Sequence, residues 1–198
     1  MKRTLAVLLL AAVTFAASAQ TPVRVRGTIQ SYDNQTLVVK SRTGELVTIK
    51  LAEKFAVAGV APATLADVVP GKFIGTATLG QKDGALVALE VLIFPEAMRG
   101  ANEGHYPWDL QPESLMTNAT IADVASGSGA GRVLTLKYKD GEKKVLVPEG
   151  VPIVTFLHAE RTELKPGAHV FVGTARQSDG SYTAGRVNVG LNGLVPPM

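Results

Sequence analysis

Pro70-Gly71, Gly75-Thr76-Ala77 and Asp83-Gly84 are three short motifs that decide the fold, because the second half of the chain repeats them. The copies, in the same order, are Pro166-Gly167, Gly173-Thr174-Ala175 and Asp179-Gly180. The spacing is 96 residues for the Pro-Gly and Asp-Gly pairs and 98 residues for Gly-Thr-Ala. Landmarks that recur in order at nearly one spacing indicate a tandem duplication.

Runs of alternating apolar and polar residues surround these motifs. In the first copy, residues 23–31 alternate in this way, and residues 37–40 and 46–51 flank a Gly-containing turn. Two further runs cover residues 73–79 and 85–94, and the second copy has runs in the same order. A period of two is typical of half-buried strands. Each copy is therefore expected to form about five short strands.

These patterns predict an all-β protein. We expect two tandem five-stranded barrels, OB-like or SH3-like, formed by residues 20–94 and 117–190 and joined by an ordered irregular strap at residues 95–116. A small sheet with one apolar face closes readily into a barrel, because closure removes exposed strand edges. A single two-sheet sandwich of all ten strands is the alternative. Residues 191–198 are expected to form a C-terminal tail.

Together these landmarks resemble an exported bacterial family of small β-barrel domains of unknown function. The resemblance covers residues 23–94 and 117–190 and implies a small barrel for each copy. Chains with this layout sometimes carry metal-transport labels, but we expect that a permease label cannot apply here, because no segment after residue 20 has the pattern of a membrane span. The residues that carry it in the first copy, with the Leu-x-Val strand, are Gly27-Thr28-Ile29, Gly44, Leu65-Ala66-Asp67, Pro70-Gly71, Gly75-Thr76-Ala77 and Asp83-Gly84.

The first 19 residues have the pattern of an export signal. Lys2 and Arg3 precede the apolar run from Leu5 to Ala17, and Ala17-Ser18-Ala19 supplies the small residues of a cleavage site. The run is too short to span a bilayer, and the chain has no Cys to carry a lipid anchor. We expect a cleaved signal peptide and a periplasmic or secreted mature chain that has no membrane span and is not a lipoprotein.

The charge balance argues against a nucleic-acid partner. Lys2 and Arg3 account for two of the three net positive charges, so the mature chain would be nearly neutral. Basic residues do not gather with aromatic residues, as they do in nucleic-acid interfaces. Because an exported chain without Cys has no disulfides, an apolar core must hold the fold together.

Residues 95–116 form the one long segment that the duplication does not repeat. Connections of this length inside compact proteins are uncommon and are often functional or disordered. Aromatic and aliphatic residues favour order here, because disordered linkers contain few of them. We expect a strap that packs across both barrels and is stiffened by Pro107 and Pro112.

The strap contains the candidate site residues. Met98, His105 and Met116 are soft and borderline ligands that suit Cu, and the acids of the strap could complete a harder site for Cu(II) or Zn: Glu96, Glu103 and Asp109. Tyr106 and Trp108 are the alternative, as an exposed anchor for a protein partner.

A binding role is therefore the expected function. We expect an exported, non-enzymatic binding or scaffold protein of the cell envelope, with its contacts centred on the strap. A periplasmic Cu or Zn protein is the alternative. An enzyme is the third interpretation, but none of the three His lies in a nucleophile elbow or a zinc-protease motif.

Overall fold

The computed structural model describes residues 22–81, 85–127 and 131–198. The signal peptide and the Asp83-Gly84 motif lie outside the described residues. Within them the protein is all-β, as predicted, with thirteen strands and four short 3₁₀ turns, including η1 (Leu65–Asp67), η3 (Arg161–Glu163) and η4 (Leu191–Gly193). None of the helices in these ranges is long and apolar enough to span a membrane.

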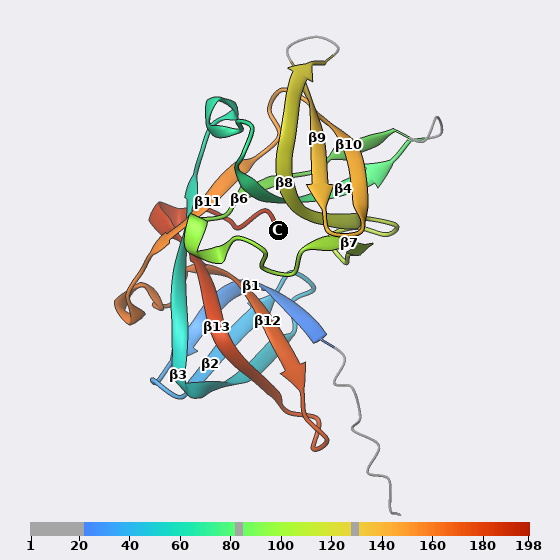
Figure 1. Ribbon diagram of the computed structural model, residues 1–198. Coiled ribbons are helices and arrows are strands. Elements are labelled where there is room, and N and C mark those ends of the chain that lie inside the picture. Colours follow the sequence, from blue (N-terminus) through green and yellow to red (C-terminus); the bar gives the residue numbers. More distant parts are fainter. Residues whose placement is uncertain (1–21, 82–84, 128–130) are drawn as a thin grey trace, which may run out of the picture.

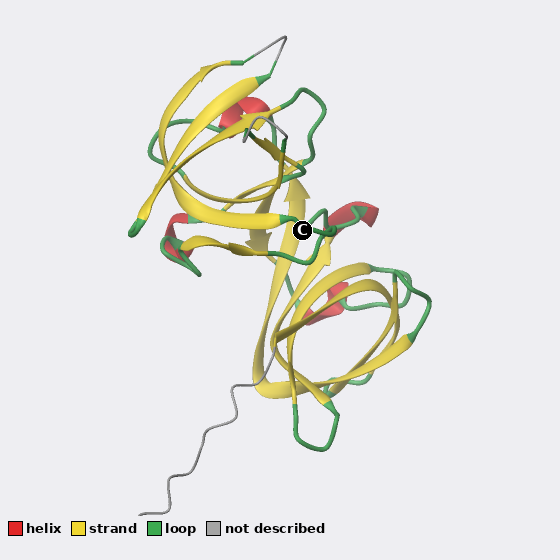
Figure 2. Ribbon diagram, turned by 90° about the vertical axis from the view of Figure 1, so that its right-hand side faces the viewer, coloured by secondary structure: helices red, strands yellow, loops and turns green. Residues whose placement is uncertain are grey.

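Five strands form a closed barrel, which lies at the bottom of Figure 1 and is the lower ring in Figure 2. The strands are β1 (Pro22–Tyr32), β2 (Thr36–Ser41), β3 (Leu46–Pro62), β12 (His169–Arg176) and β13 (Tyr182–Gly190). Their order is β13-β12-β1-β2-β3, and a parallel pairing of β13 with β3 closes the ring. The prediction of a closed five-stranded barrel is thereby confirmed for one set of strands.

Alternation along the strands fills this barrel. Every second residue of β2 is buried, so Leu37 and Val39 face inward while Lys40 faces solvent. The inward residues of all five strands form one apolar core, whose fully buried members include Ile29, Leu37, Val39, Ile49, Val172, Val187 and Val189. This burial provides the main stabilisation of the barrel.

A second circuit of pairings lies above the barrel in Figure 1. It runs through β4 (Phe73–Gly80), β5 (Leu86–Ala88), β10 (Gly141–Val147), β9 (Arg132–Tyr138) and β8 (Leu115–Ser126), and β8 pairs back to β4. This group encloses its own apolar core, with Ile74, Val91, Ala119, Leu134, Leu136 and Val145 fully buried.

The two copies exchange strands. The closed barrel combines β1–β3 of the first copy with β12–β13 of the second, and the upper group combines β4–β5 with β8–β10. The structure therefore differs from the predicted barrels of residues 20–94 and 117–190, and two tandem barrels are not confirmed. The reason lies in β3, whose 17 residues run beyond the barrel, so that the chain continues into the upper group.

The strands meet at a junction between the two groups. The end of β3 pairs with β11 (Ile153–His158), and β11 pairs in turn with β6 (Val91–Ile93). Val60 lies opposite Phe156, 96 residues further along the chain, so this pair joins equivalent positions of the two copies. A third apolar cluster fills the junction: Ala58, Val60, Leu92, Val154, Phe156 and Met198.

The strap is ordered but less irregular than expected. It begins with a 3₁₀ turn, η2 (Glu96–Met98), and continues into a short strand, β7 (Gly104–Pro107), which pairs with the start of β8. The β7–β8 connection is closed by hydrogen bonds between Trp108 and Ser114, with the Trp108 N–H donating to the Ser114 carbonyl at 2.8 Å. Pairing with β8 satisfies the backbone of residues 104–107, which explains the strand there.

Candidate functional site

A cavity of about 170 Å³ lies where the barrel, the upper group and the strap meet. The end of the described chain is also there, at the centre of Figure 1. The lining comes from every part of the fold: Gly75, Glu90, Leu92, Phe94, Met98, Ala101, Asn102, Tyr106, Trp108, Met116, Asn118, Phe156, Phe171, Arg186, Asn188 and Met198. The site therefore depends on the arrangement of both copies.

Most of this wall is apolar and aromatic. Phe94 lies between Phe73 and Phe156, with ring centroids 5.4 and 6.0 Å away. Phe171 faces Trp108 from the barrel side at 6.4 Å. Such a wall favours an apolar body, and a few polar groups then determine which molecule is accepted.

Glu90 is the most unusual polar group of the cavity. Its side chain is 0% exposed, and its Oε1 accepts a hydrogen bond from the Ala77 N–H at 2.8 Å. Its Oε2 has no hydrogen-bond partner in the protein. Burial raises the pKa of Glu90 to about 8, although the Ala77 hydrogen bond and the charge of Arg26 act in the opposite direction. Glu90 is therefore mostly a neutral carboxylic acid at pH 7.

Two asparagines of the cavity resemble Glu90, because each has one hydrogen-bonded and one unpaired side-chain atom. The Nδ2 of Asn118 donates to the Ala101 carbonyl at 3.1 Å and to the Tyr106 hydroxyl at 3.2 Å. The Nδ2 of Asn188 donates to the Phe171 carbonyl at 3.0 Å. Because a carbonyl can only accept, these bonds fix which end of each amide is the nitrogen. The Oδ1 atoms of both asparagines are buried and have no partner in the protein.

Trp108 supplies a donor. Its Nε1 is buried and unpaired, while its ring packs against the Arg24 guanidinium at 3.8 Å and against Tyr106 at 6.1 Å. The adjacent Asp109 accepts a hydrogen bond from Arg26 at 2.7 Å and lies 3.7 Å from Arg24. Burial would raise the pKa of Asp109, but the hydrogen bond and the charges of the two arginines lower it overall. These contacts fasten the strap to β1.

The unpaired polar atoms are concentrated in this one place. Among the described residues, five buried side-chain atoms lack a partner, and four of them belong to residues that line the cavity. The fifth is the hydroxyl of Tyr32, which packs against Phe55 in the barrel. A buried polar atom without a partner costs about 1–3 kcal/mol. A bound molecule that pairs these four atoms would remove this cost.

The duplication explains how these groups come together. At the spacing of 96, Glu90 is equivalent to Arg186, and Leu92 is equivalent to Asn188. The strand pairings support this equivalence. β6 pairs with β11, and their counterparts at the spacing of 96, β13 and the end of β3, pair with each other in the same parallel direction. All four residues line the cavity. The cavity therefore lies between equivalent strands whose side chains have diverged in charge and polarity.

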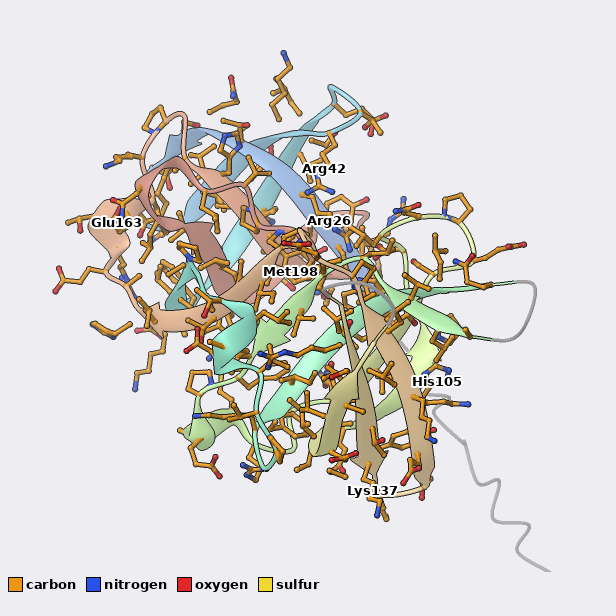
Figure 3. All side chains as sticks on the ribbon, turned by 90° about the horizontal axis from the view of Figure 1, so that it is seen from above. Arg26, Arg42, His105, Lys137, Glu163 and Met198 are labelled. Atoms are coloured by element: carbon orange, nitrogen blue, oxygen red, sulfur yellow. The ribbon has the colours of Figure 1, made fainter. Side chains whose placement is uncertain are left out.

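The structure brings together two of the three predicted metal ligands. Met98 and Met116 line the cavity, and the Arg186 guanidinium lies 3.3 Å from the Met98 sulfur. His105 faces away, because neighbouring residues of a strand point to opposite faces and Tyr106 points into the cavity. The His105 Nδ1 lies 2.8 Å from the Thr117 hydroxyl, in a separate groove, and Figure 3 shows His105 apart from Met198.

The other strap residues also have other roles. Glu96 forms an ion pair with Arg99, Asp109 pairs with Arg26, and Glu103 is exposed. In the part of the chain that the structure describes, no three His, Cys, Asp or Glu side chains are grouped to hold a metal. Tyr106 and Trp108, the predicted partner anchor, are half-buried and line the cavity.

Sequence reasoning missed four polar residues of the cavity. Glu90 lies between β5 and β6, Asn118 on β8, and Arg186 and Asn188 on β13, so these residues are far apart in the chain and were not expected to share a site. One signal was present for Glu90: it is the lone charge within the apolar run from Ala85 to Phe94. A charge in a continuous apolar strand has to be accommodated in the interior.

Comparison with protein families, curated proteins and solved structures found no match to this chain. The resemblance to an exported barrel family stays a prediction, and the site rests on its own geometry.

Proposed function

We propose that this is an exported, non-enzymatic binding protein that takes a small organic molecule into the cavity between the barrel, the upper group and the strap. The observation that carries the proposal is that four residues of a mostly apolar cavity each have a buried polar atom without a partner. Export rests on the signal pattern of residues 1–19.

The fixed orientation of the polar groups supports binding. The Asn118 and Asn188 amides are each anchored by hydrogen bonds through Nδ2, and Glu90 is anchored through Oε1. Groups held by the fold lose little entropy when a ligand arrives, which is the basis of preorganised recognition. The proposal further treats the upper group as a second small barrel, so that the ligand lies between two barrels that share strands.

The strap closes the cavity on one side. It contributes Met98, Ala101, Tyr106 and Trp108 to the wall, and Asp109 fastens it to the barrel. This retains the expectation that binding is centred on residues 95–116, but with the contacts on the inner face of the strap. If the protein also acts as a scaffold in the envelope, its contacts with partners would depend on whether the cavity is loaded or empty.

Copper is the second candidate ligand, because Met98 and Met116 line the same cavity. The Arg186 guanidinium beside the Met98 sulfur disfavours a cation there. Native mass spectrometry with Cu(I) tests this candidate. Uptake of one equivalent that Met116→Leu removes and His105→Ala leaves unchanged would support a thioether site, whereas no uptake at micromolar Cu(I) would exclude it.

The test of the proposed function uses one cavity variant and one matched control. Ala101→Leu adds a larger side chain to the cavity wall, whereas Ala97→Leu adds the same side chain at an exposed position of η2. Ligand-observed NMR is recorded with toluene, phenol, benzamide, acetophenone and cyclohexanol, each added separately. We expect at least one probe to bind, and Ala101→Leu alone to abolish binding. No binding at millimolar concentrations, or equal binding to both variants, would refute the proposal.

A further inference from the structure

The donors and acceptors around the cavity define the chemistry of the ligand, and this inference rests on the proposed function. Asn118 and Asn188, which both line the cavity, each have a buried and unpaired oxygen, which can only accept. Trp108, a third lining residue, has a buried and unpaired indole N–H, which can only donate. A ligand that pairs these three groups carries at least two hydrogen-bond donors and one acceptor.

The fourth unpaired atom is compatible with the same ligand. Because the Ala77 N–H occupies Oε1 of Glu90, the neutral acid carries its proton on Oε2, which has no partner in the protein to which it donates. A ligand carbonyl accepts two hydrogen bonds through its two lone pairs. One carbonyl oxygen could therefore accept from both Trp108 and Glu90.

The charged groups favour a neutral ligand. Arg186 lines the cavity. Arg26 on β1 lies near enough for its charge to lower the pKa of Glu90. Its guanidinium donates to Asp109 at 2.7 Å and to the Met198 main-chain oxygen at 2.8 Å. A cation would lie near Arg186 without a buried counter-ion, because Glu90 is mostly neutral. A carboxylate would gain from the charge of Arg186, but it has no donors and would leave the two asparagine oxygens unpaired.

The size of the cavity limits the rest of the molecule. An engineered apolar cavity of about 150 Å³ binds benzene, and this one measures about 170 Å³. It therefore accommodates one six-membered ring and a small polar substituent. The aromatic wall from Phe94, Phe156 and Phe171 suits such a ring.

We infer that the cavity recognises a neutral molecule with a ring-sized apolar body and a primary carboxamide or an equivalent pairing of N–H donors with a carbonyl. The N–H₂ group donates to the oxygens of Asn118 and Asn188, and the carbonyl oxygen accepts from Trp108. Glu90 adds a second donor to that carbonyl.

Benzamide and acetophenone test this inference, because they differ only in N–H₂ against CH₃. Isothermal titration of the full mature chain should show benzamide binding at least tenfold more tightly, since acetophenone leaves both asparagine oxygens unpaired. Benzylamine and benzoate are the charged probes. Stronger binding of either charged probe than of benzamide would overturn the neutral assignment.

Asparagine variants locate the preference. Asn188→Leu keeps the branched shape of the side chain and removes its oxygen, so the preference for benzamide over acetophenone should fall while acetophenone still binds. Retained acetophenone binding also shows that the site has folded. Asn118→Leu is an independent second variant, used if Asn188→Leu binds neither probe. An unchanged preference in a variant that still binds acetophenone would refute the assignment.

The two levels of proposal fail in different ways. If benzamide and acetophenone bind equally well, and Ala101→Leu abolishes both, the carboxamide inference is wrong while the proposed function stands. If none of the ring-sized probes binds, the proposed function fails together with the inference.

Discussion

Replacing Glu90 by Gln should change how the stability of the protein depends on pH. The side chain is fully buried, and burial raises its pKa from an ordinary 4.5 to about 8. Between these two values the folded state holds a proton that the unfolded state releases. Stability therefore falls as pH rises from about 4.5 to about 8, and the loss is complete above pH 8. Gln has the same shape and does not titrate.

The size of the effect follows from the pKa shift. One pKa unit corresponds to about 1.4 kcal/mol, so the full shift is worth up to about 5 kcal/mol. Relaxation and water entry would reduce this figure, and about 3–5 kcal/mol is the expected range. Glu90→Gln should thus match the wild type near pH 4.5 and be more stable by this amount at pH 9.

Urea unfolding between pH 4.5 and 9 measures the effect, with the fluorescence of Trp108 and circular dichroism as two probes. Glu149→Gln is the control, because Glu149 is exposed and the same chemical change there should leave the pH curve unaltered. Subtracting the two variant curves removes the contributions of the other titrating groups. Parallel curves for the wild type and Glu90→Gln would refute the buried-acid argument, and with it the neutral state of Glu90 in the site.

Three further predictions concern the strap and the exchanged strands. Trp108→Ala should lower the free energy of unfolding by about 3 kcal/mol, because the ring packs against Arg24 and Phe171. Trp108→Phe should lower it less. A change near zero for Trp108→Ala would mean that Trp108 does not fasten the strap. Asp109→Asn should lower the free energy of unfolding by about 1 kcal/mol near pH 7, after allowance for exposure. At a pH well below the lowered pKa of Asp109 the carboxyl is protonated, and the substitution should have no effect. Glu103→Gln in the same strap is the control. Residues 20–116 expressed alone should show no cooperative unfolding by circular dichroism, because β3 lacks its partner β13; a cooperatively folded fragment would instead support one barrel per copy.

The duplication has a consequence for the origin of the site. Glu90 and Arg186 occupy equivalent positions, as do Leu92 and Asn188, and all four line one cavity. In a symmetric ancestor each pair would have been identical. Divergence at these positions converts a symmetric junction into one with distinct donors and acceptors.

The sequence by itself determined the local structure. The alternation of Leu37 and Val39 with polar residues and the Gly-containing turns specify strands and hairpins, because these signals involve neighbours along the chain. The sequence also indicated the duplication and an ordered segment at residues 95–116. For that segment it gave no sign of β7, whose four residues become a strand only through pairing with β8.

Only the tertiary structure decided which strands close the barrel and which residues share the cavity. The two copies carry similar patterns, so by pattern alone β3 could pair equally well with the last strand of either copy. In the structure it pairs with β13 of the second copy. The same choice places Glu90, Asn118 and Asn188 around one cavity and turns His105 away from Met98 and Met116. Periodicity specifies the face on which a side chain lies, whereas the partner across that face depends on the pairing of strands distant in sequence.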